Sequence, residues 1–142
     1  MSSPSLTFQK ALRDRLVGDV GVTNLVPSAN IFDAHGLPSV FPSIIIGEAQ
    51  EISSNLTFDD MSIDVFHTLH IWTREPGLVD VKRIGGAVRR AIGKSRFFLP
   101  TVDEFQACDV GFDGVRYVRD SDGETGHGIL TVRAMMQELV TI

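Results

Sequence analysis

Residues 62–74 read SIDVFHTLHIWTR, and this stretch decides the fold. Successive side chains of a β-strand point to opposite faces of its sheet. One face of the predicted strand is apolar apart from one histidine, and it carries Ile63, Val65, His67, Leu69 and Ile71. The other face is polar but interrupted by two aromatic residues, and it carries Ser62, Asp64, Phe66, Thr68, His70 and Trp72. We therefore predict a strand with one buried face and one face that a single subunit covers only in part.

A helix is predicted directly after this strand, opened by Pro76 and ended by Gly93. Its apolar stripe recurs at helical spacing and consists of Leu78, Val81, Ile84, Val88, Ala91 and Ile92. Cationic side chains lie on the opposite side of this helix: Lys82, Arg83, Arg89 and Arg90. The pair Gly85–Gly86 costs roughly 1 kcal/mol per residue relative to alanine in a helix, so we expect close packing there.

Two long strands are predicted after Pro100, at about residues 103–119 and 127–139. Alternating apolar residues of the second strand are expected to point inward, namely Leu130, Val132, Ala134 and Met136. The residues 119–124 between the strands contain Asp122–Gly123, a pair typical of hairpins because glycine accepts positive φ. Residues 120–123 also resemble part of a calcium loop but lack its remaining ligands, so a hairpin is the favoured interpretation.

The N-terminal half predicts one long helix and one further strand. Ser3 and Pro4 suit a helix start, followed at helical spacing by Phe8, Ala11, Leu12 and Leu16, with Gly18 as a stop. A short helical turn is expected at 22–26, irregular chain at 28–40, a strand at 41–47 and an exposed loop at 51–60. The order of helices and strands predicts an α+β fold with a mainly antiparallel sheet packed against two main helices.

The length and composition fit one domain spanning residues 1–142. The chain is 43% hydrophobic and 22% charged, as in ordinary globular proteins. Cys108 is the only cysteine, so no internal disulfide can form. The longest aliphatic run is Ile44–Ile46, and the first residues are neither basic nor apolar, so we expect no membrane span and no signal peptide.

The charges are unevenly distributed along the chain. The net charge is −5, which argues against a general nucleic-acid binder. No lysine or arginine occurs between Arg15 and Arg74, whereas this stretch carries Asp19, Asp33, Glu48, Glu51, Asp59, Asp60 and Asp64. The following residues are mainly cationic, with Arg74, Lys82, Arg83, Arg89, Arg90, Lys94 and Arg96. A protein that is positive on one side and negative on the other favours head-to-tail contacts between copies.

No catalytic or metal-binding constellation is apparent in the sequence. His67 and His70 are predicted to point to opposite faces of their strand, which argues against a shared metal ion. His35 and His127 lie in predicted loop and turn regions, and we expect all four histidines to be structural or solvated. Phosphate loops, dinucleotide fingerprints and nucleophile elbows are missing. We therefore expect neither an enzyme nor a bound cofactor or metal.

Several segments of the chain are similar in order and spacing to one known family. They are residues 67–77 continued by Lys82, Ile84, Val88 and Ile92, residues 119–128, Phe41–Pro42 with Gly47–Glu48, and the opening Leu12–Leu16. Together they resemble the tail-completion (tail-to-head joining) proteins of long-tailed phages and gene transfer agents, over nearly the whole chain.

This resemblance implies a tail-terminator-like fold and a structural role in a virion or virus-like particle assembled in the bacterial cytoplasm. It implies a ring of identical subunits, usually a hexamer, that caps the tail tube protein and then binds the connector or head-closure protein. DNA would pass through the ring without specific binding, which suits an acidic subunit because like charges repel. No membrane partner is implied.

The charge distribution and the resemblance together indicate candidate contact residues. We expect charged contacts between subunits at Asp59, Asp60, Arg83, Arg89 and Arg90. Exposed ion pairs contribute only about 0–1 kcal/mol each, so apolar residues would have to supply much of the affinity: Phe66, Trp72, Phe97 and Phe98. At the hairpin tip, Asp120, Asp122 and Glu124 are candidates for axial contact with the tube or the connector.

Three alternatives remain open on the sequence. One is a head-closure or other neck protein, which differs only by its position in the particle. A second is a single-stranded nucleic-acid-binding module that uses the basic helix with Trp72, Phe97 and Phe98 for stacking. A third is a small enzyme whose site forms only in an oligomer.

Overall fold

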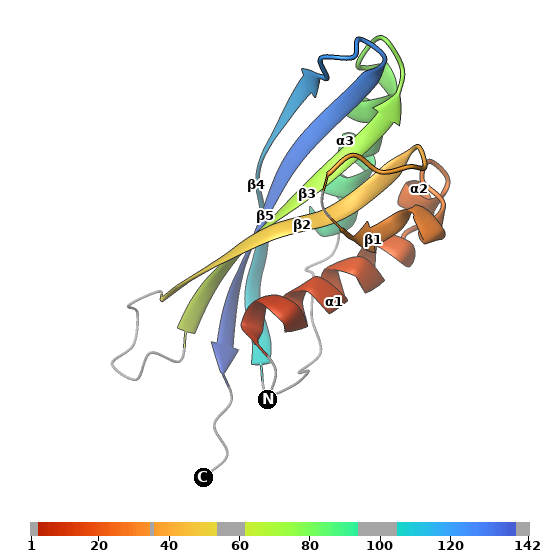
Figure 1. Cartoon of the computed structure of the whole chain (residues 1–142). Coiled ribbons are helices and arrows are strands. Elements are labelled where there is room, and N and C mark those ends of the chain that lie inside the picture. Colours follow the sequence, from red (N-terminus) through yellow and green to blue (C-terminus); the bar gives the residue numbers. More distant parts are fainter. Residues whose placement is uncertain (1–2, 35, 54–61, 94–104, 139–142) are drawn as a thin grey trace.

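The computed structural model describes residues 3–34, 36–53, 62–93 and 105–138, so the sequence predictions for His35, Asp59, Asp60, Phe97 and Phe98 lie outside the described residues. The elements follow one another as α1 (Pro4–Val17), α2 (Val20–Thr23), the 3-10 turn η1 (Ser28–Asn30), β1 (Ile31–Asp33), β2 (Ser43–Ser53), β3 (Ser62–Arg74), α3 (Val79–Gly93), β4 (Phe105–Arg119) and β5 (Thr125–Glu138). Figure 1 shows one twisted sheet with α1 and α3 packed along it.

The five strands lie in the order β1-β2-β3-β5-β4. Only β1 and β2 run parallel, and the other neighbouring strands pair antiparallel. β3 is central and pairs with β5 over its whole length, from Ser62 opposite Gln137 to Arg74 opposite Thr125. The prediction of an α+β fold with a mainly antiparallel sheet is confirmed.

The two faces of the sheet differ in what covers them. Leu69 lies between Ile46 and Leu130 on the face toward the helices, whereas His70 lies between Ile45 and Ile129 on the other face. We call this second face the open face because α1 and α3 both pack on the first. Buried side chains between sheet and helices form one core, including Phe8, Leu12, Leu16, Val65, Leu69, Ile71, Val81, Val88, Leu130, Val132, Ala134 and Met136. The alternation predicted for residues 62–74 is confirmed.

α1 begins and ends where the sequence predicted. The Oγ of Ser3 accepts the backbone N–H of Leu6 at 3.1 Å, which satisfies one of the unpaired amides of the first turn, and proline follows at the first helical position. Phe8, Leu12 and Leu16 lie four residues apart on one face and are fully buried against the sheet.

α3 begins at Val79, later than the predicted start at Pro76. The carboxylate of Glu75 accepts the backbone N–H groups of Asp80 and Val81, each at 3.0 Å. Residues 76–78 therefore form a turn that places this carboxylate at the positive end of the helix dipole, where a negative charge is stabilising. Glu75 therefore caps the helix, whose start the sequence placed at Pro76.

The two glycines inside α3 have different surroundings. A Cβ at Gly85 would collide with the hydroxyl of Tyr117 on β4, so the missing side chain lets the Tyr117 ring pack closely against α3. A Cβ at Gly86 would meet nothing within 4 Å among the described residues. The prediction of close packing is therefore confirmed for Gly85 and wrong for Gly86 within one subunit.

The N-terminal predictions need three corrections. Residues 28–40 are not irregular throughout, because they contain η1 and β1. The short helix is at Val20–Thr23 and not at 22–26, because the carboxylate of Asp19 accepts the N–H of Val22 and starts it earlier. β2 continues to Ser53 past a bulge between Ile46 and Ala49, although 51–60 was expected to be loop. Both β1 and the extension of β2 depend on pairing with a neighbouring strand, which the local sequence does not reveal.

The predicted hairpin between β4 and β5 is confirmed. The N–H of Gly123 donates to the Asp120 carbonyl at 3.1 Å, and Gly123 has a φ of 73°, which glycine adopts without strain. The Asp122 carboxylate accepts the N–H of Glu124 and both the N–H and hydroxyl of Thr125. These bonds give Asp122 a local structural role in the turn.

Candidate functional site

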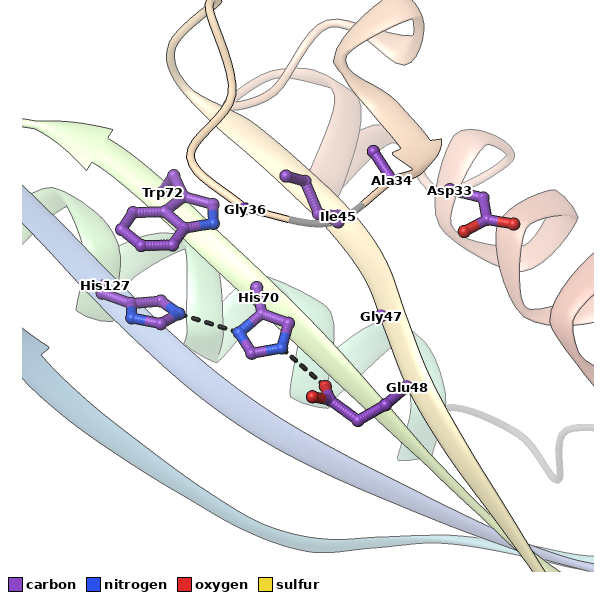
Figure 2. A pocket seen from close by; sticks show the side chains of 9 residues that line it. All are labelled: Asp33, Ala34, Gly36, Ile45, Gly47, Glu48, His70, Trp72 and His127. Carbon is purple, nitrogen blue, oxygen red and sulfur yellow. Dashed lines mark hydrogen bonds and ion pairs between the residues drawn. The ribbon is translucent and has the colours of Figure 1, made fainter.

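A hollow of about 660 Å³ lies on the open face, where the β1–β2 connection passes over the sheet. Figure 2 shows its lining: Asp33, Ala34, Gly36, Ile45, Gly47, Glu48, His70, Trp72 and His127. The connection also explains why Trp72 and Ile45 are only 8% and 1% exposed although neither belongs to the core under the helices. The hollow therefore collects residues of β2, β3 and β5 that are far apart in the sequence.

A chain of polar contacts crosses the hollow from β2 to β5. The Nε2 of His70 lies 2.7 Å from the Oε1 of Glu48, and its Nδ1 lies 2.8 Å from the Nε2 of His127. The ring of His127 in turn stacks on Trp72, with centroids 3.7 Å apart and planes within 9°. Figure 2 shows His127, His70 and Glu48 in a line with Trp72 stacked over His127, and we call these four side chains the Glu48–Trp72 row.

The hydrogen-bond partners assign the tautomers in this row. An ionised Glu48 only accepts, so His70 must donate from Nε2, and a neutral His70 then accepts at Nδ1. His127 consequently donates from its Nε2 to His70. In this arrangement each donor points toward Glu48, which holds the carboxylate in one position on the surface.

Burial and neighbouring charges shift the pKa values of the row. Burial is the main reason that the pKa of His127 is lowered to about 4, and the nearby His70 acts in the same direction. The hydrogen bond from His70 is the main reason that the pKa of Glu48 lies below its usual value. At neutral pH the row therefore ends in a carboxylate and carries no cation at His127.

Glycine permits the close approach that the row requires. A Cβ at Gly47 would lie 2.7 Å from the Cδ2 of His70, closer than real Cβ contacts allow. The His70 ring therefore approaches the backbone of β2 closely at Gly47, the residue before Glu48. The indole nitrogen of Trp72 is buried, and no group in the described ranges forms a hydrogen bond with it.

The row presents a limited set of chemical groups. It holds a carboxylate and imidazole rings but presents no hydroxyl or thiol beside them, within the described residues, that they could activate. In the described part of the chain, no three histidine, cysteine, aspartate or glutamate side chains are arranged to hold a metal ion. What the row offers a partner is an oriented negative charge.

The outer face of α3 offers the opposite charge. Lys82, Arg83, Arg89 and Arg90 are all exposed, as the sequence predicted. Arg83 pairs with Asp80 at 3.4 Å, and the guanidinium of Arg89 lies 5.3 Å from the ring centroid of Phe112 on β4. A shallow depression of about 490 Å³ runs between Gly86, Arg89, Arg90 and Gly93.

The two predicted aromatic contact residues differ in accessibility. Phe66 is half-buried on the open face, where the guanidinium of Arg133 lies 5.8 Å from its ring centroid. Trp72 is already covered within the subunit, so it contributes to the surface mainly by supporting His127. They are six positions apart along the strand, roughly 20 Å, so they do not form one patch.

At the hairpin tip Glu124 is exposed and Asp120 is half-buried, whereas the Asp122 carboxylate is engaged in the turn. The structure thus brings the cationic residues together on α3 and the three acidic residues together at the tip. The sequence prediction missed the Glu48–Trp72 row, since its two histidines are 57 residues apart. Strand alternation placed His70 and Trp72 on one face, but no local signal indicates that β5 adds His127.

No helix in the described ranges is long and apolar enough to cross a membrane.

Comparisons with known proteins agree with the family resemblance seen in the sequence and with the observed fold. Residues 10–137 match the model of the family described as tail completion protein gp17. A chain of the solved "Virion of native gene transfer agent (GTA) particle" superposes with a TM-score of 0.75 at 18% identity, over 96% of this chain and 99% of that one. No curated protein matches the sequence. The chain belongs to the tail completion protein gp17 family and is a structural protein of a phage-type tail.

Proposed function

We propose that the protein is the tail terminator of its particle, a structural and non-catalytic subunit. In this proposal identical copies close into a ring, a hexamer by analogy with the family, that caps the tail tube. The ring then binds the connector or head-closure protein and joins tail to head. Family membership over residues 10–137 supports a place in the tail, and the virion chain with the same fold supports assembly with other particle proteins.

The main observation that supports a ring is that opposite charges lie on opposite faces of a two-layer domain. The exposed cationic residues of α3 lie on the helix side of the domain, whereas Glu48 lies on the open face. Two copies can bring such surfaces together only head to tail. A head-to-tail contact forms a closed ring when its rotation closes, and otherwise an open filament.

The remaining contacts stay proposals at the residues named from the sequence. Arg83, Arg89 and Arg90 would contact the neighbouring subunit together with Phe66. Glu124 and Asp120 would contact the tube or the connector along the ring axis. The net charge of −5 suits a lumen through which DNA passes without being held.

The proposal is tested by mass and by position. We expect the purified protein to have the mass of a closed oligomer by light scattering, and to lie between tail tube and head in imaged particles. Changing Arg89 and Arg90 together to Glu should lower the yield of joined particles without lowering the thermal stability of the subunit. An unchanged yield would contradict the role of α3, and a position on the head side of the neck would identify a head-closure protein instead.

A further inference from the structure

The outer face of α3 contains a glycine for which the described residues give no packing reason. Gly86 is exposed, and a Cβ there would meet no atom within 4 Å among the described residues. Residues three and four positions away on a helix are its neighbours on the same face. Gly86 therefore has Lys82 and Arg83 one turn before it and Arg89 and Arg90 one turn after it. A position without a side chain lies between two pairs of cations.

This arrangement suits an approaching anion. The depression of about 490 Å³ at Gly86 and Gly93 is bordered by Arg89 and Arg90, and Arg90 is exposed. A guanidinium binds a carboxylate through two parallel hydrogen bonds, which fix orientation as well as charge. Because glycine adds no bulk, the carboxylate can come close to the helix backbone. We call this surface the Gly86 groove.

Glu48 on the open face has the matching properties. Its side chain is 71% exposed, yet its Oε1 is held by His70, which His127 holds in turn. A carboxylate fixed in this way loses little conformational freedom when it binds a partner. The hydrogen bond from His70 also lowers the pKa of Glu48, so the group stays ionised at neutral pH.

We propose that Glu48 of one copy docks into the Gly86 groove of the next copy, where it pairs with Arg90. This inference rests on the proposed ring and identifies its contact. It replaces the acidic loop around Asp59 and Asp60 as the principal partner of the basic helix. Because Glu48 and the groove lie on opposite faces of the sheet-and-helix domain, each copy offers both halves of the contact at once, and the copies follow one another head to tail.

The test uses charge reversal of each half, in the full-length protein. Glu48→Lys and Arg90→Glu should each weaken assembly at least tenfold, as measured by native mass spectrometry across a concentration series. An equal mixture of the two variants should assemble again. Where the variants meet, the lysine introduced at position 48 faces the glutamate introduced at position 90. The other contacts in such a ring keep the original residues on both sides, so the rings should contain equal numbers of both variants.

Matched controls separate this contact from general effects of charge. Asp14→Lys on α1 makes the same charge change at an exposed position that lines neither the hollow around Glu48 nor the Gly86 groove, and we expect it to assemble like the unchanged protein. Gly86→Leu should fold at least as stably as the original, because leucine favours helix, yet it should assemble at least tenfold less well. Thermal unfolding of each variant checks that the subunit is folded.

The outcomes distinguish the contact from the ring itself. If the unchanged protein forms no oligomer and is absent from the neck, the proposed function fails. If it forms rings but Glu48→Lys assembles normally, or the mixture does not recover, the ring stands and the Glu48 contact is overturned. If a single-stranded oligonucleotide binds the unchanged protein and Arg90→Glu abolishes that binding while rings persist, the groove binds phosphate and the contact is likewise overturned.

Discussion

The two faces of the sheet give side chains of the same strand different surroundings, as two histidines of β3 show. His67 points toward the helices, is 1% exposed, and neither of its ring nitrogens has a hydrogen-bond partner among the described residues. His70 points to the open face and has a partner at each ring nitrogen. Burial on the covered face disfavours a charged imidazole, whereas on the open face an imidazole orients a carboxylate. The covered face therefore contributes most to stability, and in our proposal the open face supplies the carboxylate of the subunit contact.

The largest expected effect contrasts neighbouring residues of β3. Leu69→Ala should lower the free energy of unfolding by about 2–5 kcal/mol, because leucine is fully buried between sheet and helices and alanine leaves a cavity. Thr68→Ala on the open face should cost less than about 1 kcal/mol. Urea denaturation of both variants measures the contrast, and equal losses would contradict a core confined to the helix side.

A second prediction concerns the buried imidazole of His67. Burial lowers its pKa in the folded protein, so the unfolded chain binds a proton more readily below pH 6.5. The stability is fully present above that pH and is lost as the pH falls toward the lower pKa of the folded state. His67→Leu should flatten this loss and add about 1–2 kcal/mol at neutral pH, because it removes unsatisfied nitrogens. Unfolding measured at several pH values tests both statements, and an unaltered pH profile would exclude His67 as its source.

The open face offers an optical measurement, since Trp72 is the only tryptophan and stacks on His127. The pKa of His127 is about 4, so protonation of this ring should change the tryptophan fluorescence with a midpoint near that pH. The free energy of unfolding should also fall as the pH decreases from 6.5 toward 4, because the folded state disfavours protonation of His127. His127→Phe retains an aromatic stack, worth about 0.5–1.5 kcal/mol, but should abolish the titration. A transition that survives this substitution would have to come from another group.

The smallest effect extends the contrast to the two sides of α3. Gly86→Ala should raise the free energy of unfolding by about 0.5–1 kcal/mol, because alanine favours helix and meets no neighbour among the described residues of the subunit. Gly85→Ala should be destabilising despite the same gain in propensity, because the new Cβ meets Tyr117. If the subunit packs as described, thermal unfolding should show a higher melting temperature for Gly86→Ala and a lower one for Gly85→Ala.

Local patterns were sufficient for most of the fold. The alternation at residues 62–74, the apolar stripes of α1 and α3 and the Asp122–Gly123 turn were each confirmed. β1 was missed because three residues carry too little periodicity, and they become a strand only by pairing with Ile44, Ile45 and Ile46. The start of α3 was misplaced because its cap is a side chain that reaches forward from Glu75.

The sequence by itself determined the α+β class, the two long strands that follow α3 and the cationic face of that helix, since all of these follow from spacing along one segment. Only the tertiary structure decided that His127 joins His70, that Gly47 lets the ring approach and that Trp72 is covered. These contacts depend on which strands become neighbours in the sheet and in what register. Pairing of that kind joins residues distant in the chain, and the spacing within a single segment carries no record of it.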